Sequence, residues 1–230
     1  MNAKYIVFLS FILILCVHTV YSIDLTEKEI EARLIGEYNR GFEYNAGMSA
    51  AGGIELNKIL KFRSGISFKK SEELSDLSLF LSGKYSPFSK VPVSFSLLYI
   101  YNNLYEYETS IHSVLPYISF NAKRAGVSIG LNSRFTSFFE EQPQFESILS
   151  SCVYFNFVNK ETLRIGVSLG NFDEFYARNI SAYSFNINTL IRINNKWSII
   201  NDFELMQSGG DGLLSAFYGF GWRGGARFTW

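Results

Sequence analysis

Residues 216–230 alternate between two kinds of side chain, and this alternation restricts the fold more than any other feature of the chain. The aromatic and aliphatic residues share one parity, interrupted only by Gly224: Ala216, Tyr218, Phe220, Trp222, Ala226, Phe228 and Trp230. The opposite parity is mostly small, with Arg223 and Arg227 as its charges. Because successive side chains of a β-strand point to opposite faces, the stretch predicts a strand with one apolar face and one small or cationic face.

The same period of two runs through most of the chain from residue 34 onward. Residues 163–170 show it most cleanly, because Leu163, Ile165, Val167 and Leu169 alternate with charged, hydroxyl and glycine residues. The segments run to about ten residues or more, which is longer than the usual strand of a globular protein. We count about twelve of them, an even number, as single-chain bacterial barrels have.

The N-terminus has the features of an export signal. Lys4 precedes an apolar run over residues 6–17, and Val20 and Ser22 are small enough for the positions before a cleavage site. We therefore expect residues 1–22 to be a signal peptide that is removed. A membrane anchor would need about 20 apolar residues, and a lipoprotein leader ending at Cys16 would have Leu15 in an unusual place.

The last strand ends on an aromatic residue and resembles the C-terminal strand of bacterial outer-membrane β-barrel proteins. In that family such a strand is the assembly signal, and here Trp222, Phe228 and Trp230 carry the resemblance. The resemblance implies the bacterial outer membrane as the location, with its lipid and the barrel-assembly machinery as partners. After the leader no apolar stretch has the length of a spanning helix, so a membrane protein made from this chain has to be a closed barrel.

Periodicity alone does not say which face is inside, since a soluble β-sandwich or ligand-binding barrel also alternates. Export, long strands and a polar face rich in glycine and serine favour lipid outside and water inside. We predict an all-β fold, a transmembrane antiparallel up-and-down barrel over residues 34–230. Residues 23–33 are expected to be a lead-in or a short helix, because Thr26 and Glu29 have the spacing of a capping box.

Connection length gives an independent indication of orientation. If both termini are periplasmic, every second connection is a periplasmic turn, and these turns are short and carry a lysine: they lie at Asn57, Ser89, Ala122, Asn159 and Asn195. The intervening connections are mostly longer, as outer-membrane barrels place them on the external side.

Composition excludes several classes of function. The chain has 21 Lys and Arg residues in total and 21 Asp and Glu residues, so its formal net charge is zero and nothing indicates a nucleic-acid partner. No metal or nucleotide signature is present, and we expect no cofactor. The mature chain has one histidine, His112, and its neighbour Ser113 faces the opposite side of a strand, so the two do not form a catalytic dyad. We therefore expect a protein that is not an enzyme.

The polar face of the predicted barrel carries many charges, which are the candidate pore-lining residues: Lys61, Arg63, Lys69, Lys84, Arg134, Arg164, Arg192, Arg223, Arg227, Glu37, Glu55, Asp76, Asp202 and Glu204. One interpretation is a weakly anion-preferring pore. The other is an internal lattice of ion pairs that fills and stiffens the barrel.

Three functions remain open from the sequence. The leading one is a small porin-like passive channel with a mixed-charge, slightly cationic lumen and small hydrophilic solutes or anions as its cargo. The second is a structural or adhesive barrel with a filled lumen and external binding loops. The third is a lipid- or peptide-hydrolysing barrel enzyme. An autotransporter translocator also has twelve strands, but we expect no passenger ahead of the predicted barrel.

Overall fold

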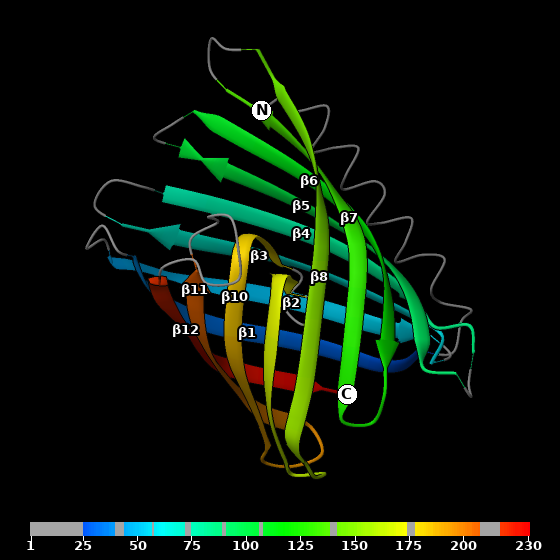
Figure 1. Ribbon diagram of the computed structural model, residues 1–230. Helices are drawn as coiled ribbons and strands as arrows, with labels where there is room; N and C mark the ends of the chain where they lie inside the picture. Colours follow the sequence, from blue (N-terminus) through cyan, green and yellow to red (C-terminus); the bar gives the residue numbers. More distant parts are fainter. Residues whose placement is uncertain are drawn as a thin grey trace.

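The chain folds into a closed barrel of antiparallel strands (Figure 1). The computed structural model describes residues 25–39, 44–56, 58–71, 75–88, 91–105, 108–138, 142–173, 178–207 and 217–230. These residues form twelve strands: β1 (Leu25–Asn39), β2 (Tyr44–Leu56), β3 (Leu60–Lys70), β4 (Ser75–Tyr85), β5 (Val93–Leu104), β6 (Thr109–Asn121), β7 (Ala125–Ser137), β8 (Gln144–Asn159), β9 (Leu163–Asp173), β10 (Arg178–Arg192), β11 (Trp197–Gln207) and β12 (Phe217–Thr229). Each strand pairs with its neighbours in sequence, which confirms the predicted up-and-down barrel.

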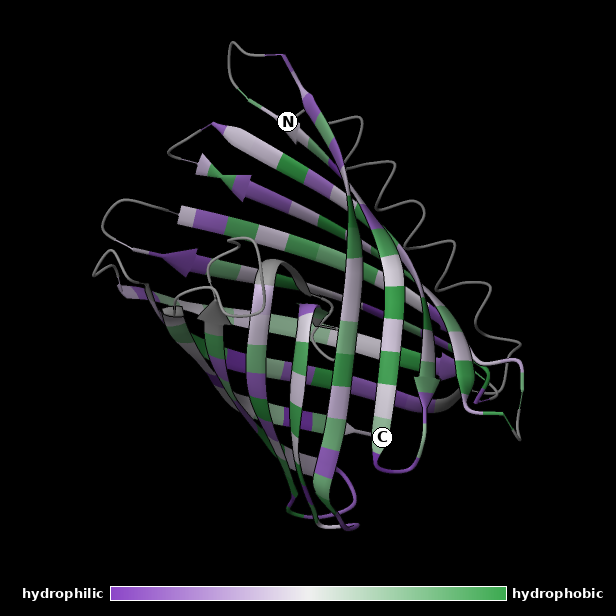
Figure 2. Cartoon of the chain, in the orientation of Figure 1, coloured by the Kyte–Doolittle hydropathy of each residue, from purple (hydrophilic) through white to green (hydrophobic). Residues whose placement is uncertain are grey.

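The apolar parity of each strand faces outward. On β6, Val114, Ile118 and Phe120 are exposed, whereas the intervening Leu115 and Ser119 are buried inside the barrel. The hydropathy colouring shows this alternation along the strands (Figure 2). A band of exposed large apolar side chains on a closed barrel is the arrangement that contacts lipid hydrocarbon. The described part of the chain contains no helix that is long and apolar enough to cross a membrane.

The first and last strands close the barrel. β1 and β12 pair along their length, with Ile30 opposite Phe228 and Ala32 opposite Ala226. The C-terminal residue takes part in the closure, because the backbone N–H groups of Lys28 and Trp230 each donate to the carbonyl oxygen of the other residue at 3.0 Å. Closure leaves no sheet edge with unpaired backbone groups, which hydrocarbon would not tolerate.

The start of the barrel differs from the sequence prediction. The expected lead-in or short helix over residues 23–33 is wrong from Leu25 onward, because β1 begins there and the barrel starts nine residues before position 34. The spacing of Thr26 and Glu29 does indicate a helix locally. Pairing with β2, and from Glu29 onward also with β12, holds this segment in a strand and overrides that local preference. The predicted signal peptide over residues 1–22 lies outside the described residues.

The five predicted turns connect strands at one end of the barrel, and four of them are short. The connection at Ser89 is longer than predicted, because β4 ends at Tyr85 and β5 begins only at Val93. β2 ends at Leu56 and β3 begins at Leu60, and Lys58 between them has a φ of 58°, the left-handed conformation that a tight turn requires. At the β10–β11 turn the Asn194 side chain accepts hydrogen bonds from the backbone N–H groups of Lys196 at 2.9 Å and Trp197 at 2.8 Å. These local bonds hold the β10–β11 turn.

Candidate functional site in the barrel interior

The structure places the candidate pore-lining residues on the inward-facing parity of their strands. Glu37, Asp76, Asp202, Glu204 and Arg223 are buried in the interior. Six more are partly buried there: Glu55, Lys61, Arg63, Lys69, Lys84 and Arg227. Arg134 is partly buried near the end with the longer connections, where it forms an ion pair with Glu146 at 2.8 Å. Arg164 and Arg192 are exposed, near the end that carries the short turns.

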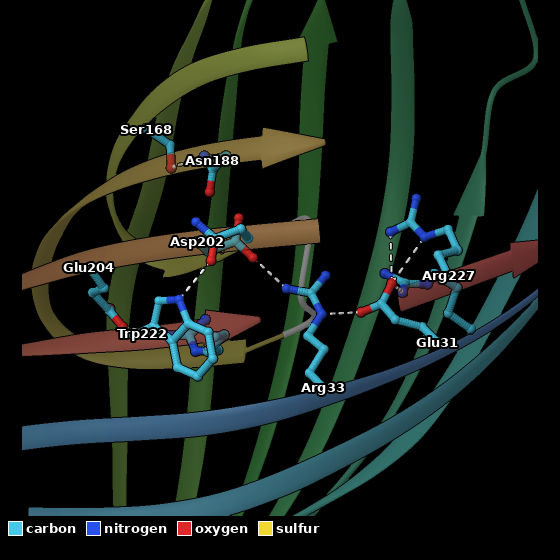
Figure 3. A network of polar contacts seen from close by, with 11 residues as sticks. Glu31, Arg33, Ser168, Asn188, Asp202, Glu204, Trp222 and Arg227 are labelled. Atoms are coloured by element: carbon cyan, nitrogen blue, oxygen red, sulfur yellow. Dashed lines mark hydrogen bonds and ion pairs between the residues drawn. The ribbon is translucent and has the colours of Figure 1, made fainter. Parts of the chain in front are cut away.

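Glu31 on β1 is the centre of an interior network of charges. Its carboxylate accepts hydrogen bonds from Arg227 on β12, at 2.8 Å from Nη2 and 3.0 Å from Nε. It also pairs with the Arg63 guanidinium on β3 at 3.3 Å and accepts from Nε of Arg33 on its own strand. One carboxylate therefore links three strands, and Figure 3 shows it between Arg33 and Arg227.

Arg33 extends the network to β11. Its Nη1 donates to Asp202 Oδ2 at 2.5 Å, across β12, so that the guanidinium lies between two carboxylates (Figure 3). Beside this pair, Arg223 on β12 donates to Glu204 on β11. Both pairs are almost completely buried. The wall formed by β11, β12 and β1 therefore contains two adjacent buried ion pairs.

Further ion pairs run from β1 to β3 and pass over β2. Glu29 pairs with Arg63 at 2.7 Å and with Lys61 at 3.4 Å. Glu37 pairs with Lys69 at 3.2 Å, and Lys69 reaches Asp76 on β4 at 3.4 Å. The charged network thus comprises six carboxylates and six cations: Glu29, Glu31, Glu37, Asp76, Asp202, Glu204, Arg33, Lys61, Arg63, Lys69, Arg223 and Arg227.

Small residues on β2 make room for these contacts. Its inward parity reads Gly47, Ser49, Ala51 and Gly53. A Cβ at Gly53 would lie 2.9 Å from Glu29 Oε1 and 3.0 Å from Arg63 Cγ, so any side chain there would push against the ion pair above it. The charged side chains of β1 and β3 meet because the residues of β2 between them have small side chains or none.

The cations of the network are generally more exposed than their carboxylates. The side chain of Lys61 is 32% exposed and that of its partner Glu29 only 4%. Lys69 is 26% exposed against 8% for Glu37, and Arg227 is 21% against 6% for Glu31. The pairs of Arg33 are buried on both sides, and the separate Arg134–Glu146 pair has the opposite order. Inside the network, the charge that water reaches is therefore mainly positive.

The opposite side of the interior holds an apolar cluster. It comprises Leu98 and Ile100 on β5, Leu115 and Tyr117 on β6, Cys152 on β8 and Phe172 on β9, with Phe80 of β4 packed against it. Leu98, Leu115 and Phe172 are each only 1% exposed. These side chains therefore have almost no contact with water.

The cluster also spans a strand of small residues. The rings of Tyr117 on β6 and Phe172 on β9 have centroids 5.2 Å apart, so they meet across β7 and β8. A Cβ at Gly130 on β7 would lie 2.6 Å from Tyr117 Cβ and 2.9 Å from Leu115 Cδ1. The side chains of β6 can reach over β7 because that position has no side chain.

Partly exposed small residues line the interior of β2, β3 and β4. We call them the small-residue strip: Ser49, Ala51, Ser67, Ser78 and Ser82. Small residues on the far side differ in exposure, because Ser119, Ser128, Ser150 and Ser184 are all buried. Water therefore reaches the interior mainly over β2–β4, beside Lys61 and Lys69.

His112 lies away from the interior. It faces outward on β6, where its Nδ1 is 2.8 Å from the hydroxyl oxygen of Tyr99 and its ring contacts Tyr101. Ser113 is buried on the inward face, so the two side chains point apart as the sequence predicted. Within the described ranges, no group of three or more His, Cys, Asp or Glu residues is placed to hold a metal ion.

Sequence analysis missed two parts of this interior. The predicted barrel boundary at residue 34 leaves Glu29, Glu31 and Arg33 outside. Their alternation with Ile30, Ala32 and Leu34 is nevertheless a signal of a strand. The second part is the apolar cluster, whose signal is that residues 97–101 and 114–115 are apolar on both parities. Such runs indicate strands that are apolar on both faces.

No protein-family model matches the sequence, and no curated protein matches it. Solved structures match its fold. The translocator domain of the autotransporter NalP from Neisseria meningitidis has a TM-score of 0.55 at 9% identity, covering 98% of this chain and 96% of that chain. The NanC porin has a TM-score of 0.58 at 7% identity, covering 86% and 98%. The KdgM porin in complex with disordered oligogalacturonate has a TM-score of 0.56 at 10% identity, covering 87% and 98%.

Proposed function

We propose that this protein, which has the fold of a bacterial outer-membrane β-barrel, is a small porin-like passive channel with a weak preference for anions. Its inward face is polar over most of the circumference, as the wall of an aqueous path must be. Solved porins share its fold over most of its length. Small hydrophilic solutes are the cargo that such a wall suits.

The observation that carries the anion preference is the unequal exposure within the ion pairs. In the pairs Lys61–Glu29, Lys69–Glu37 and Arg227–Glu31 the cation is several times more exposed than the carboxylate. A solute in the lumen is therefore closer to positive than to negative charge. Since the interaction between charges weakens with distance, an ion responds most to the nearer partner. Exposed cations lower the barrier for anions in a narrow channel.

The preference is weak because the same wall contains the compensating carboxylates. Each of those three cations has a carboxylate within 3.4 Å, so its field is partly cancelled at the distance of a passing ion. A channel with this wall favours anions modestly and still passes cations. The KdgM porin, which shares this fold, forms a complex with an oligogalacturonate. For this chain we propose only the broader class of small anionic and neutral hydrophilic solutes.

We also propose that the barrel is not a hydrolase. A hydrolytic site needs a nucleophile within hydrogen-bond distance of a base. His112 faces outward against Tyr99 and Tyr101, whereas Ser113 faces the interior. Replacing His112 by alanine is therefore expected to leave membrane permeability unchanged, and a lipid or peptide hydrolysis that depends on His112 would contradict the proposal.

The C-terminal strand supports a proposal about assembly. β12 pairs with both β1 and β11, and Trp222, Phe228 and Trp230 are on its outward parity. We propose that the barrel-assembly machinery recognises this strand before the barrel closes. Replacing Trp230 by alanine is expected to lower the amount of protein in the outer membrane of a bacterial host while leaving the refolding of pure protein largely intact.

Conductance in a planar bilayer tests the channel directly. The refolded protein is expected to give stepwise currents, with a reversal potential under a KCl gradient that indicates a modest chloride preference. Lys61→Gln and Lys69→Gln together are expected to move that potential toward zero. Arg164→Ala, at the mouth, is expected to reduce the preference less, and Arg223→Ala probes the buried pair of Glu204.

The outcome also separates the channel from a structural barrel with a filled lumen. The burial of Arg33, Asp202, Glu204 and Arg223 is the observation that favours filling. A folded protein that gave no current would reject the open channel and favour the structural barrel. Current with no change of selectivity in the Lys61→Gln, Lys69→Gln double variant would retain the channel and reject the cationic wall.

A further inference from the structure

The apolar cluster is the interior feature that an aqueous channel does not need. Inward-facing leucine, isoleucine and phenylalanine side chains do not attract hydrophilic solutes. Here they come from strands on one side of the barrel and contact one another as a globular core does. The barrel therefore carries a small hydrophobic core inside a wall that is otherwise polar.

This core is fixed rather than loosely arranged. Leu98 and Leu115 are directly opposite each other on β5 and β6, and both are almost completely buried. The Tyr117–Phe172 ring contact connects β6 to β9, over the gap left by Gly130. Close-packed side chains of this kind resist displacement, because moving one leaves a void.

Phe80 marks the boundary between the cluster and the small-residue strip. It packs against the cluster from β4. Its ring extends over β3, since a Cβ at Gly65 would lie 2.4 Å from Phe80 Cε1. Ser78 and Ser82 of the strip flank Phe80 on the same face of β4. The more exposed Lys61 and Lys69 lie on the inward face of β3, so the cluster and the strip meet at this ring.

We infer that the apolar cluster is an internal wall that sets the size limit of the pore and confines solutes to the small-residue strip over β2–β4. The inference rests on the proposed channel function and adds the residues that determine its size selectivity. Hydrated solutes avoid an apolar constriction, because entering it removes their water without replacing it. They therefore move past the serines of β3 and β4 and the adjoining lysines.

Removing side chains from the wall tests the inference. Leu115→Ala and Phe172→Ala are expected to raise single-channel conductance roughly twofold, because each deletion leaves a cavity that widens a narrow path. They are also expected to admit larger neutral polyethylene glycols in a polymer-exclusion measurement. The reversal potential under a KCl gradient should stay where it is in the original protein, because the lysines are untouched.

Two matched variants separate size from charge. Val114→Ala removes a similar volume from the lipid-facing neighbour of Leu115 and is expected to change neither conductance nor polymer exclusion. Lys69→Gln is expected to shift the reversal potential and leave the excluded polymer size unchanged. Folding of each variant is checked by circular dichroism and by heat-modifiable mobility on a gel. If an alanine variant does not fold, Leu115→Val and Phe172→Leu are expected to give smaller changes in the same direction.

The results distinguish this inference from the proposed function. If the original protein conducts and the wall variants conduct equally and exclude the same polymers, the wall is overturned and the channel stands. If the original protein is silent and Phe172→Ala opens a current, the wall is supported and the open passive channel fails. Silence in the original protein and in every folded wall variant would overturn both.

Discussion

On both sides of the barrel interior, side chains contact each other across a position occupied by a small residue. The contacts are ion pairs on one side and apolar contacts on the other. On one side Glu29 reaches Arg63 over the low position at Gly53, and on the other Tyr117 reaches Phe172 past Gly130. Ion pairs leave their cations partly in water, whereas the aromatic and aliphatic contacts exclude water. The difference shows that strand parity decides which residues are inside, and that the residues that cross the small positions decide whether water enters that region.

The largest effect on stability is expected at Glu31, a buried carboxylate that several cations share. Glu31→Ala leaves Arg33 and Arg227 without their common partner, and the free energy of unfolding should fall by about 3–5 kcal/mol. Tryptophan fluorescence during urea unfolding in lipid vesicles measures the change. The matched variant is Glu146→Ala, whose side chain is 50% exposed beside Arg134. It should lower the unfolding free energy by at most about 1 kcal/mol, and equal losses would show that the ion pairs of the network have no special role.

A smaller effect on stability is expected on β2, whose small residues lie between Glu29 on β1 and Arg63 on β3. Gly53→Val places methyl groups where Glu29 and Arg63 meet, and it should reduce the free energy of unfolding by about 1–3 kcal/mol. Gly52→Val is the control, because Gly52 is on the lipid-facing parity and a Cβ there would meet only the Glu29 backbone oxygen at 3.7 Å. A control that lost as much stability as Gly53→Val would mean that strand glycines matter for reasons unrelated to the ion pair.

The smallest effect on stability is expected at an exposed end of the network. Lys69→Gln should change the free energy of unfolding by less than about 1 kcal/mol, since Lys69 keeps much of its contact with water. Its effect on the reversal potential should nevertheless be measurable. A large loss of stability at this position would assign Lys69 to the filling of the barrel and remove it from the conducting surface.

The architecture followed from the sequence because hydrocarbon imposes a simple rule on every strand. Alternation in residues 163–170 and 216–230 predicted the strands, and the long strands with a polar face rich in glycine and serine predicted which face points outward. Most candidate interior charges were also found this way. The alternation within a single strand identifies its inward-facing residues even when the neighbouring strands are not known. The N-terminal boundary was missed at Thr26 and Glu29, where a helical spacing coincides with a strand that only β12 and β2 stabilise.

The grouping of the interior residues was not predictable to the same extent. The Arg33–Asp202 pair joins residues 169 positions apart, and its formation depends on which strands become neighbours when the barrel closes. Likewise, Leu98 and Phe172 belong to one cluster because small residues on β7 and β8 let side chains cross. Parity places a residue inside the barrel, whereas contacts across intervening strands depend on side-chain size at positions far apart in the sequence.

Cysteine accessibility during current recording tests most directly whether the interior has a conducting side and a filled side. In a Cys152→Ala background, Ala51→Cys on β2 and Leu98→Cys on β5 would each be exposed to a membrane-impermeant thiol reagent. We expect the reagent to modify Ala51→Cys and reduce its current, and to leave Leu98→Cys unmodified with its current intact. Rapid modification of Leu98→Cys together with an unaffected current in Ala51→Cys would contradict the account, because solutes would then pass along the apolar cluster.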